Sequence, residues 1–245
     1  MRVSSLLGSI KNLKNVETML KKVAPQSSGI QFRQADISDF DMIMPKVTQI
    51  FLQEQLVKAF GLQPAEIFPV CEFVALNSLK SKCSIIAVDK EMEKLCGFRL
   101  QSIYRRNDPS LDSYVKMLPL KCDNIKQLVY FAKVIRQDVW NYLPEDVNTV
   151  LYRRLMYVDD SYKNDTLVKK MYEENFDEEA FKTCGLDGSI VEATTAGHRD
   201  MLKGWGYNVV KEIRYDEFAE LQKLENIEPT SQGCLGSIQF LFKRF

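Results

Sequence analysis

Leu-Met-Tyr-Val-Asp-Asp-Ser-Tyr-Lys-Asn-Asp-Thr-Leu-Val-Lys-Lys-Met occupies residues 155–171. Its first residues complete an apolar run, Val150–Val158, which predicts a strand. The pattern after the polar loop predicts a helix from Thr166 to about Thr183. Such a junction presents free backbone N–H groups and the positive end of a helix dipole, and both suit a pyrophosphate. Any strand–loop–helix unit offers these groups, so the junction alone identifies no ligand.

Further elements are predicted on both sides of this junction. Upstream, apolar patterns predict strands at Ile30–Gln34, Ser84–Asp89 and Leu95–Tyr104, and helices at Phe40–Phe51, Leu56–Phe60, Ala65 to about Leu79, and Asp123 to about Tyr142. Downstream, they predict strands at Ser189–Thr194, Tyr207–Arg214 and Gly236–Arg244, and a short helix at His198–Trp205. The chain therefore alternates between the two kinds of element over most of its length.

The order of these elements predicts the fold class. The hairpin at residues 84–104 implies antiparallel neighbours, whereas strand–helix–strand over Val150–Thr194 implies a crossover between parallel strands. One sheet with helices on both faces is the simplest way to bury these elements. We therefore expect an α/β (α+β) domain with a mixed, mostly antiparallel sheet of about seven strands.

The composition excludes several classes of function. Lysine plus arginine equals aspartate plus glutamate at 33 each, so the chain has no bulk positive field to attract a nucleic acid. No apolar run approaches the ~18 residues that a membrane span requires, so no stable membrane insertion is expected. The six cysteines are widely spaced without a C-x-x-C pair, which predicts reduced thiols and no metal site.

The N-terminal segment has a different character from the rest. Residues 1–24 carry five basic side chains against one acid, Glu17, and their apolar residues recur at helical spacing. We expect residues 1–29 to form an amphipathic helix and linker ahead of one domain at residues 30–245. A cytoplasmic protein is the favoured interpretation, and a mitochondrial presequence is the alternative that the basic charge leaves open. Nothing in the sequence indicates an oligomeric state.

The stretch 155–171 also resembles motif A of the GCN5-related N-acetyltransferases (GNATs). In that family a Leu/Val-x-Val strand is followed by [RQ]-x-x-G-x-[GA]. Lys163 falls at the position of the Arg or Gln, and Thr166 and Val168 fall at the two small residues.

Other segments extend the resemblance in the same order. Ser189–Thr194 resembles the strand that follows the motif A helix, and Met201–Tyr207 resembles the segment that ends before the next strand. Phe51–Leu56 with Ala59–Leu62 is similar to a segment of the invertebrate arylalkylamine (dopamine-type) N-acetyltransferases. The resemblance implies an acyl-CoA N-acyltransferase fold over about residues 30–245.

The resemblance also implies a set of site residues. Acetyl-CoA would be the cosubstrate and a small primary amine the acceptor. The pantetheine would pair with the main chain of Met156, Tyr157 and Val158, and the pyrophosphate would lie at Lys163, Asn164, Asp165, Thr166, Leu167 and Val168.

Glu54 and His198 are the candidate catalytic side chains. In the arylalkylamine branch a glutamate at the position of Glu54 is the proposed general base, acting through water. An alkylamine is almost wholly protonated at pH 7, so a base that removes its proton is chemically needed. His198 is the only histidine, and its ordinary pKa suits proton transfer. Glu54 could instead be a solvated or capping carboxylate, and His198 a structural or surface residue.

Two functions follow from these residues. The first is an N-acetyltransferase that transfers acetyl from acetyl-CoA to a small primary amine. The second is a catalytically silent relative that keeps the fold as a binding or scaffold protein. Asn164, Thr166 and Val168 favour the second, because two of them are β-branched and none has the freedom of glycine near the phosphates. Asp165 adds a negative charge at the same place.

Overall fold

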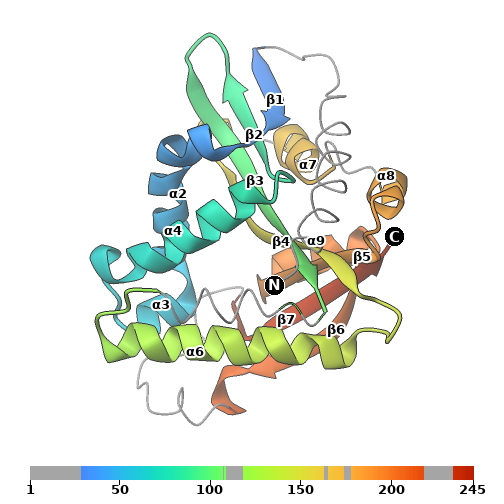
Figure 1. The fold of residues 1–245 in the computed structure, drawn as a ribbon. Coiled ribbons are helices and arrows are strands. Elements are labelled where there is room, and N and C mark those ends of the chain that lie inside the picture. The colour runs from blue at the N-terminus through green and yellow to red at the C-terminus, as the bar shows by residue number, and fades with distance from the viewer. Residues whose placement is uncertain (1–28, 107, 109–117, 163–164, 174–177, 218–233) are drawn as a thin grey trace, which may run out of the picture.

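The computed structural model of the protein describes residues 29–106, 108, 118–162, 165–173, 178–217 and 234–245. Its strands form one sheet of seven, in the order β1-β2-β3-β4-β5-β7-β6 (Figure 1). The strands are β1 (Ile30–Gln34), β2 (Ile85–Asp89), β3 (Lys94–Arg105), β4 (Thr149–Val158), β5 (Gly188–Thr195), β6 (Asn208–Arg214) and β7 (Cys234–Arg244).

Helices connect and cover these strands. The α-helices are α2 (Phe40–Gln53), α3 (Gln55–Ala59), α4 (Pro64–Lys80), α6 (Asp123–Asp138), α7 (Asp165–Glu173), α8 (Glu178–Thr183) and α9 (Ala196–Gly204). Three short 3₁₀ turns are η1 (Ile37–Asp39), η2 (Val139–Tyr142) and η3 (Tyr215–Glu217).

The sheet is mixed, and its one parallel pair lies in the middle. β4 and β5 run parallel, and every other neighbouring pair runs antiparallel. The predicted fold class is therefore confirmed, including the hairpin of β2 with β3 and the crossover from β4 to β5. The parallel pairing runs only from Val150 opposite Gly188 to Arg153 opposite Val191, although both strands continue beyond it.

Helices pack on both faces of the sheet (Figure 1). Side chains from α2, α4 and α6 join one large core cluster with Ile190 of β5. Side chains from α7 and α9 join a second cluster with Val191, the next residue of the same strand. Because successive side chains of a strand point to opposite faces, Ile190 and Val191 mark the two layers.

Two helices differ from their predicted extents. The single helix predicted from Thr166 to about Thr183 corresponds to α7 and α8, with residues 174–177 outside the described part of the chain. The helix predicted to run to Tyr142 ends as an α-helix at Asp138 and continues as the tighter turn η2. A last turn of 3₁₀ geometry is common at helix ends, and an apolar pattern does not distinguish it from an α-helix.

The N-terminal predictions concern residues that the structure does not describe. The amphipathic helix expected at residues 1–24 lies outside the described ranges, so the division at residue 29 stays a prediction. Within the described ranges, no helix combines the length and the apolar character that crossing a membrane requires.

Candidate active site

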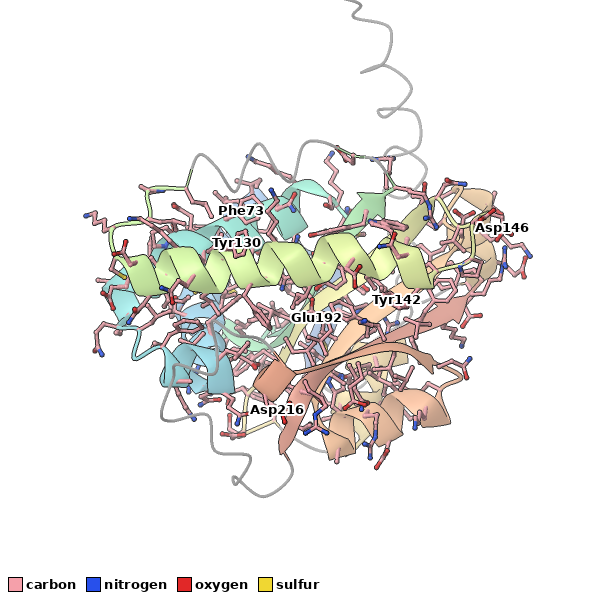
Figure 2. All side chains as sticks on the ribbon, turned by 90° about the horizontal axis from the view of Figure 1, so that it is seen from below. Phe73, Tyr130, Tyr142, Asp146, Glu192 and Asp216 are labelled. Carbon is pink, nitrogen blue, oxygen red and sulfur yellow. The ribbon has the colours of Figure 1, made fainter. Side chains whose placement is uncertain are left out.

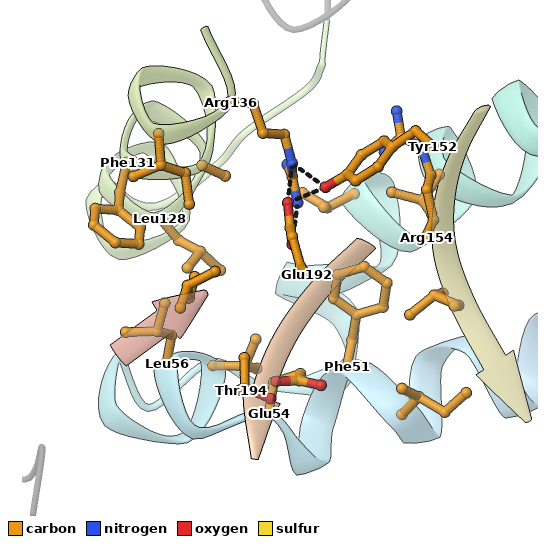
Figure 3. A pocket seen from close by; sticks show the side chains of 18 of the residues that line it. Phe51, Glu54, Leu56, Leu128, Phe131, Arg136, Tyr152, Arg154, Glu192 and Thr194 are labelled. Atoms are coloured by element: carbon orange, nitrogen blue, oxygen red, sulfur yellow. Dashed lines mark hydrogen bonds and ion pairs between the residues drawn. The ribbon is translucent and has the colours of Figure 1, made fainter. Parts of the chain in front are cut away.

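A cavity of about 330 Å³ lies between the helices of one face and the middle of the sheet (Figure 3). Apolar side chains of α2, α3, α4 and α6 form most of its wall. The charged or titratable side chains among its lining residues are Glu54, Arg136, Arg154, Glu192, His198, Tyr152, Tyr172 and Tyr215. A mostly apolar cavity of this size with a few converging polar groups is typical of a small-molecule site.

Glu54 enters the cavity from a break between two helices. Glu54 is both the C-cap residue of α2 and the N-cap residue of α3. Its extended backbone (φ −62°, ψ 136°) separates the two helices. Its backbone N–H donates to Phe51 O at 3.1 Å, and its carbonyl accepts from Lys58 N at 3.0 Å. The side chain makes no capping hydrogen bond to α3, so the carboxylate is directed to the cavity instead of the helix end.

The environment of Glu54 makes its carboxyl a weak acid. Burial disfavours the charged form, the nearby Glu192 carboxylate adds to this effect, and Lys58 opposes it. Together they raise the pKa of Glu54 from 4.5 to about 7. A carboxyl with this pKa is divided between its two protonation states at neutral pH, which is the property of an effective general base.

Across the cavity from Glu54, an ion pair joins α6 to β5 (Figure 3). Arg136 Nε donates to Glu192 Oε1 at 3.0 Å and to Tyr152 Oη at 3.0 Å. The Tyr152 hydroxyl also donates to the Glu192 carboxylate. Figure 2 shows α6 lying across this face of the sheet, with Glu192 beneath it. The negative charge of Glu192 is therefore balanced inside the protein.

Arg154 occupies an irregular position in β4. The register with β3 changes from Gln101 opposite Arg153 to Leu100 opposite Leu155, so Arg154 is an extra residue, a β-bulge. A bulge reorients the side chains around it, and here the consecutive residues Arg154 and Leu155 both line the cavity.

The main-chain edges of β4 and β5 separate beyond the bulge. Pairing between them ends at Arg153 and Val191, yet β4 continues to Val158 and β5 to Thr195. On their other sides these segments pair with β3 and β7. The facing edges at 154–158 and 192–195 thus remain outside the β4–β5 ladder, where backbone groups are available to an extended ligand.

The cavity also reaches residues of the opposite helix layer. Tyr172 of α7 and His198 of α9 line it together with Tyr152 and Glu54. Because α7 and α9 pack on the other face of the sheet, the cavity extends between the separated ends of β4 and β5. Three residues that the sequence analysis named as candidate site residues, Glu54, Met156 and His198, therefore line the same cavity.

His198 is held in the first turn of α9. The Thr195 hydroxyl caps this helix by accepting from His198 N at 3.3 Å. The ring Nε2 is 2.9 Å from Tyr172 Oη, and the Tyr172 ring packs against Trp205 with centroids 4.3 Å apart. Burial, and then the charge of Arg153, lower the pKa of His198 to about 4. The imidazole is therefore neutral at pH 7.

The predicted pyrophosphate segment is only partly described. Lys163 and Asn164 lie outside the described residues, and Asp165 and Thr166 begin α7 with side chains that are likewise not described. Leu167 is buried against Ile85, and Val168 packs in the cluster that contains Tyr172. The side chains of Leu167 and Val168 are thus part of the core, and only their backbone could face a phosphate.

The end of β4 is fixed by its own contacts. Met156 lines the cavity, whereas the Tyr157 ring packs at a tilt against Phe98, with ring centroids 5.4 Å apart. After Val158, the Asp159 carboxylate accepts from Ser161 N at 3.1 Å and from Tyr157 Oη at 3.0 Å, closing a turn before α7. The Ser161 hydroxyl also donates to this carboxylate. This hydrogen bond above all, and then the other two, hold the pKa of Asp159 well below its usual range, so the turn carries a negative charge.

Sequence reasoning missed several cavity residues: Arg136, Tyr152, Arg154, Tyr172 and Glu192. Arg136 and Glu192 are 56 positions apart, and no local pattern pairs them. A usable signal was present in the strands, where Arg154 and Glu192 interrupt otherwise apolar runs.

No group of histidine, cysteine, aspartate and glutamate side chains suited to a metal ion occurs among the described residues.

Comparisons with known proteins agree with this geometry at the level of the fold. No protein-family model matches the chain, and no curated protein matches its sequence. The structure is similar to arylalkylamine N-acetyltransferase 2 from Aedes aegypti, with a TM-score of 0.70 and 21% identity over 89% of this chain and 99% of that one. It is also similar to the polyamine N-acetyltransferase of Drosophila melanogaster, which forms N-acetylagmatine, with a TM-score of 0.69 and 14% identity over 88% and 100%. The structure therefore has the fold that the sequence resemblance implied.

Proposed function

We propose that this chain, which has the fold of the GCN5-related N-acetyltransferases, transfers acetyl from acetyl-CoA to a small primary amine. One observation carries the proposal. A carboxyl whose pKa is about 7, that of Glu54, faces a mostly apolar cavity that continues into the separated ends of β4 and β5. A base, an acceptor cavity and an open backbone edge thus meet in one place.

The residues present suit the binding of acetyl-CoA. The backbone edge at 154–158 would pair with the amide groups of the pantetheine, and the edge at 192–195 would leave room for it. The N-terminus of α7 would face the pyrophosphate with the backbone N–H groups of its first turn. When bound, the cosubstrate supplies an acetyl thioester, which reacts with the acceptor in the cavity.

The proposed reaction begins with the acceptor as an ammonium ion. Glu54, directly or through a water molecule, takes one proton and frees the nitrogen lone pair. The nitrogen then forms a bond to the carbonyl carbon of the thioester, and the bond from that carbon to sulfur breaks. The second proton leaves the nitrogen and is taken up by the departing sulfur. The products are the N-acetylated amine and the thiol of CoA.

The silent relative remains the second candidate because of two features near the N-terminus of α7. The turn after β4 carries the fixed charge of Asp159, and Val168, where the motif has a small residue, packs in the core. A negative charge near the phosphates weakens binding, and Val168 lacks the small side chain with which the motif lets the backbone approach them. This candidate predicts a folded protein that does not bind acetyl-CoA.

Turnover by Glu54→Gln tests the proposal. We expect kcat for a small primary amine to fall by about 10²–10⁴, the usual contribution of a general base, while the Kd of acetyl-CoA changes little. Glu145→Gln is the matched control, because this glutamate is exposed and does not line the cavity. Absence of both acetyl-CoA binding and turnover in the wild-type protein would establish the silent relative instead.

A further inference from the structure

The acceptor cavity contains a positive charge that the protein does not neutralise. Four of its lining residues, Arg136, Arg154, Glu54 and Glu192, are ordinarily charged. Arg136 and Glu192 form an ion pair with each other, so their charges cancel. Glu54 is divided between its two protonation states because its pKa is about 7. The remaining full charge is that of Arg154.

The contacts of Arg154 supply hydroxyls and rings, but no carboxylate. Its Nε donates to Ser102 Oγ at 3.2 Å, and its Nη2 donates to the Tyr104 hydroxyl. Its guanidinium lies over the rings of Tyr104 and Tyr152, 5.2 Å from each centroid. Within the described part of the chain, no acidic side chain forms an ion pair with it.

These contacts hold the guanidinium in a fixed orientation. Ser102 is itself buried and lies 3.3 Å from Ser78 Oγ, and the rings of Tyr104 and Tyr152 pack edge to face. The β-bulge turns Arg154 to the cavity side of β4. An arginine fixed in this way, whose Nη1 makes no hydrogen bond among the described residues, has N–H donors left with which to hold an anion.

The geometry of the cavity would place such an anion at the Arg154 side, away from Glu54. Glu54 and Thr194 lie on one side of the cavity, and Arg154 lies near Tyr152 on another (Figure 3). A ligand whose amine is at Glu54 would therefore extend its far end toward Arg154. A second ammonium at that end would meet the uncompensated guanidinium and be repelled.

We propose that the acceptor is a primary amine that also carries a carboxylate, and that Arg154 binds this carboxylate. The inference rests on the proposed acetyltransferase function and specifies its substrate class. It distinguishes the chain from an enzyme for an arylalkylamine without a carboxylate or for a polyamine, because neither ligand supplies a negative charge. Arg154 is a specificity-determining residue in this proposal.

Matched pairs of amines test the substrate class with the full-length protein. Each pair consists of a carboxylate-bearing amine and a counterpart that lacks the carboxylate: para-(aminoethyl)benzoate with phenethylamine, and a series from β-alanine to aminohexanoate with the corresponding alkylamines. A charge-assisted hydrogen bond predicts that kcat/KM favours the carboxylate by about 10-fold to 100-fold in at least one pair. A preference for the member without the carboxylate in every pair, or for agmatine over all of them, would overturn the proposal.

Arg154 variants test whether this residue causes the preference for the carboxylate-bearing amine. Arg154→Met should abolish most of the preference within a pair, Arg154→Lys should keep part of it, and Arg244→Met, at an exposed arginine, should keep all of it. If Arg154→Met does not fold, the Lys variant and the wild-type pairs still decide the matter. Equal losses for both members of a pair would show that Arg154 acts on the structure of the protein and not on the carboxylate.

A binding measurement separates this inference from the proposed function. Calorimetric titration with para-ethylbenzoate and with the neutral para-ethylbenzamide requires no turnover. If no amine is acetylated but the acid binds in an Arg154-dependent manner, the anion site is supported and the acetyltransferase proposal fails. If amines are acetylated but the acid binds no better than the amide, the carboxylate proposal fails and the acetyltransferase remains.

Discussion

Burial, and then the nearby Glu192 carboxylate, raise the pKa of Glu54, so the charge of this side chain changes in the pH range where activity is measured. Because the pKa is about 7, the base form increases as pH rises through 7. We therefore expect kcat/KM to rise about tenfold per pH unit below 7 and to level off above it, apart from any ionisation of the amine. Initial rates from pH 5.5 to 8.5 measure this rising limb of the pH profile. The Glu54→Gln variant should lack the limb.

His198 provides the internal control for that assignment. Its pKa is lowered to about 4, so it loses its proton well below the range in which the limb is expected. As the only histidine, it gives one imidazole signal by NMR, which should titrate near 4 and not near its ordinary value. A titration of His198 near 7, together with loss of the limb in His198→Gln, would transfer the role of base from Glu54 to His198.

At the scale of elements, α7 lies where the motif has its helix but carries a larger side chain at one of the motif's small positions. Val168 stands at a position where the family has a small residue, but its side chain packs in the cluster with Tyr172 and Leu202. We expect Val168→Gly to lower the free energy of unfolding by about 2 kcal/mol, from lost packing and from glycine in a helix. Lys169→Gly, at the adjacent exposed position, should cost only about 1 kcal/mol because it tests the helix effect alone.

Urea denaturation of both variants measures the difference. Acetyl-CoA affinity, measured on the same proteins, then shows whether Val168 restricts the cosubstrate. A tenfold gain in affinity for Val168→Gly, with no loss of stability beyond that of Lys169→Gly, would mean that the side chain blocks the site and contributes nothing to the core.

The elements themselves could be predicted because their patterns are local. β5 was expected at Ser189–Thr194 and is Gly188–Thr195, and the break at Glu54 was visible as a polar interruption between two apolar helices. The cavity could not be predicted in the same way. Its ion pair joins Arg136 to Glu192 across the fold, and the bulge at Arg154 depends on the register of β4 against β3. Both arise from tertiary contacts that no sequence window contains.

At the scale of the whole molecule, the sheet consists of two halves joined by a short seam. Strands β1 to β4 form one half and β5, β7 and β6 the other, and the parallel ladder between them spans only Val150–Arg153 and Gly188–Val191. A ligand bound along the remaining edges would contact both halves. Its binding energy would then add to the stability of the whole fold, by about 2.7 kcal/mol at a concentration 100 times its Kd.

Hydrogen exchange can show whether acetyl-CoA binds along the two edges beyond the seam. We expect acetyl-CoA to slow exchange of backbone amides at 154–158 and 192–195 more than at the paired seam 150–153, where the amides are already protected. Arg154→Met provides the control, because a change confined to the acceptor cavity should leave the protection at 156–158 intact. Uniform slowing over the sheet, without excess at the two edges, would indicate binding elsewhere. No slowing at saturating acetyl-CoA would mean that the separated strands serve a ligand other than acetyl-CoA.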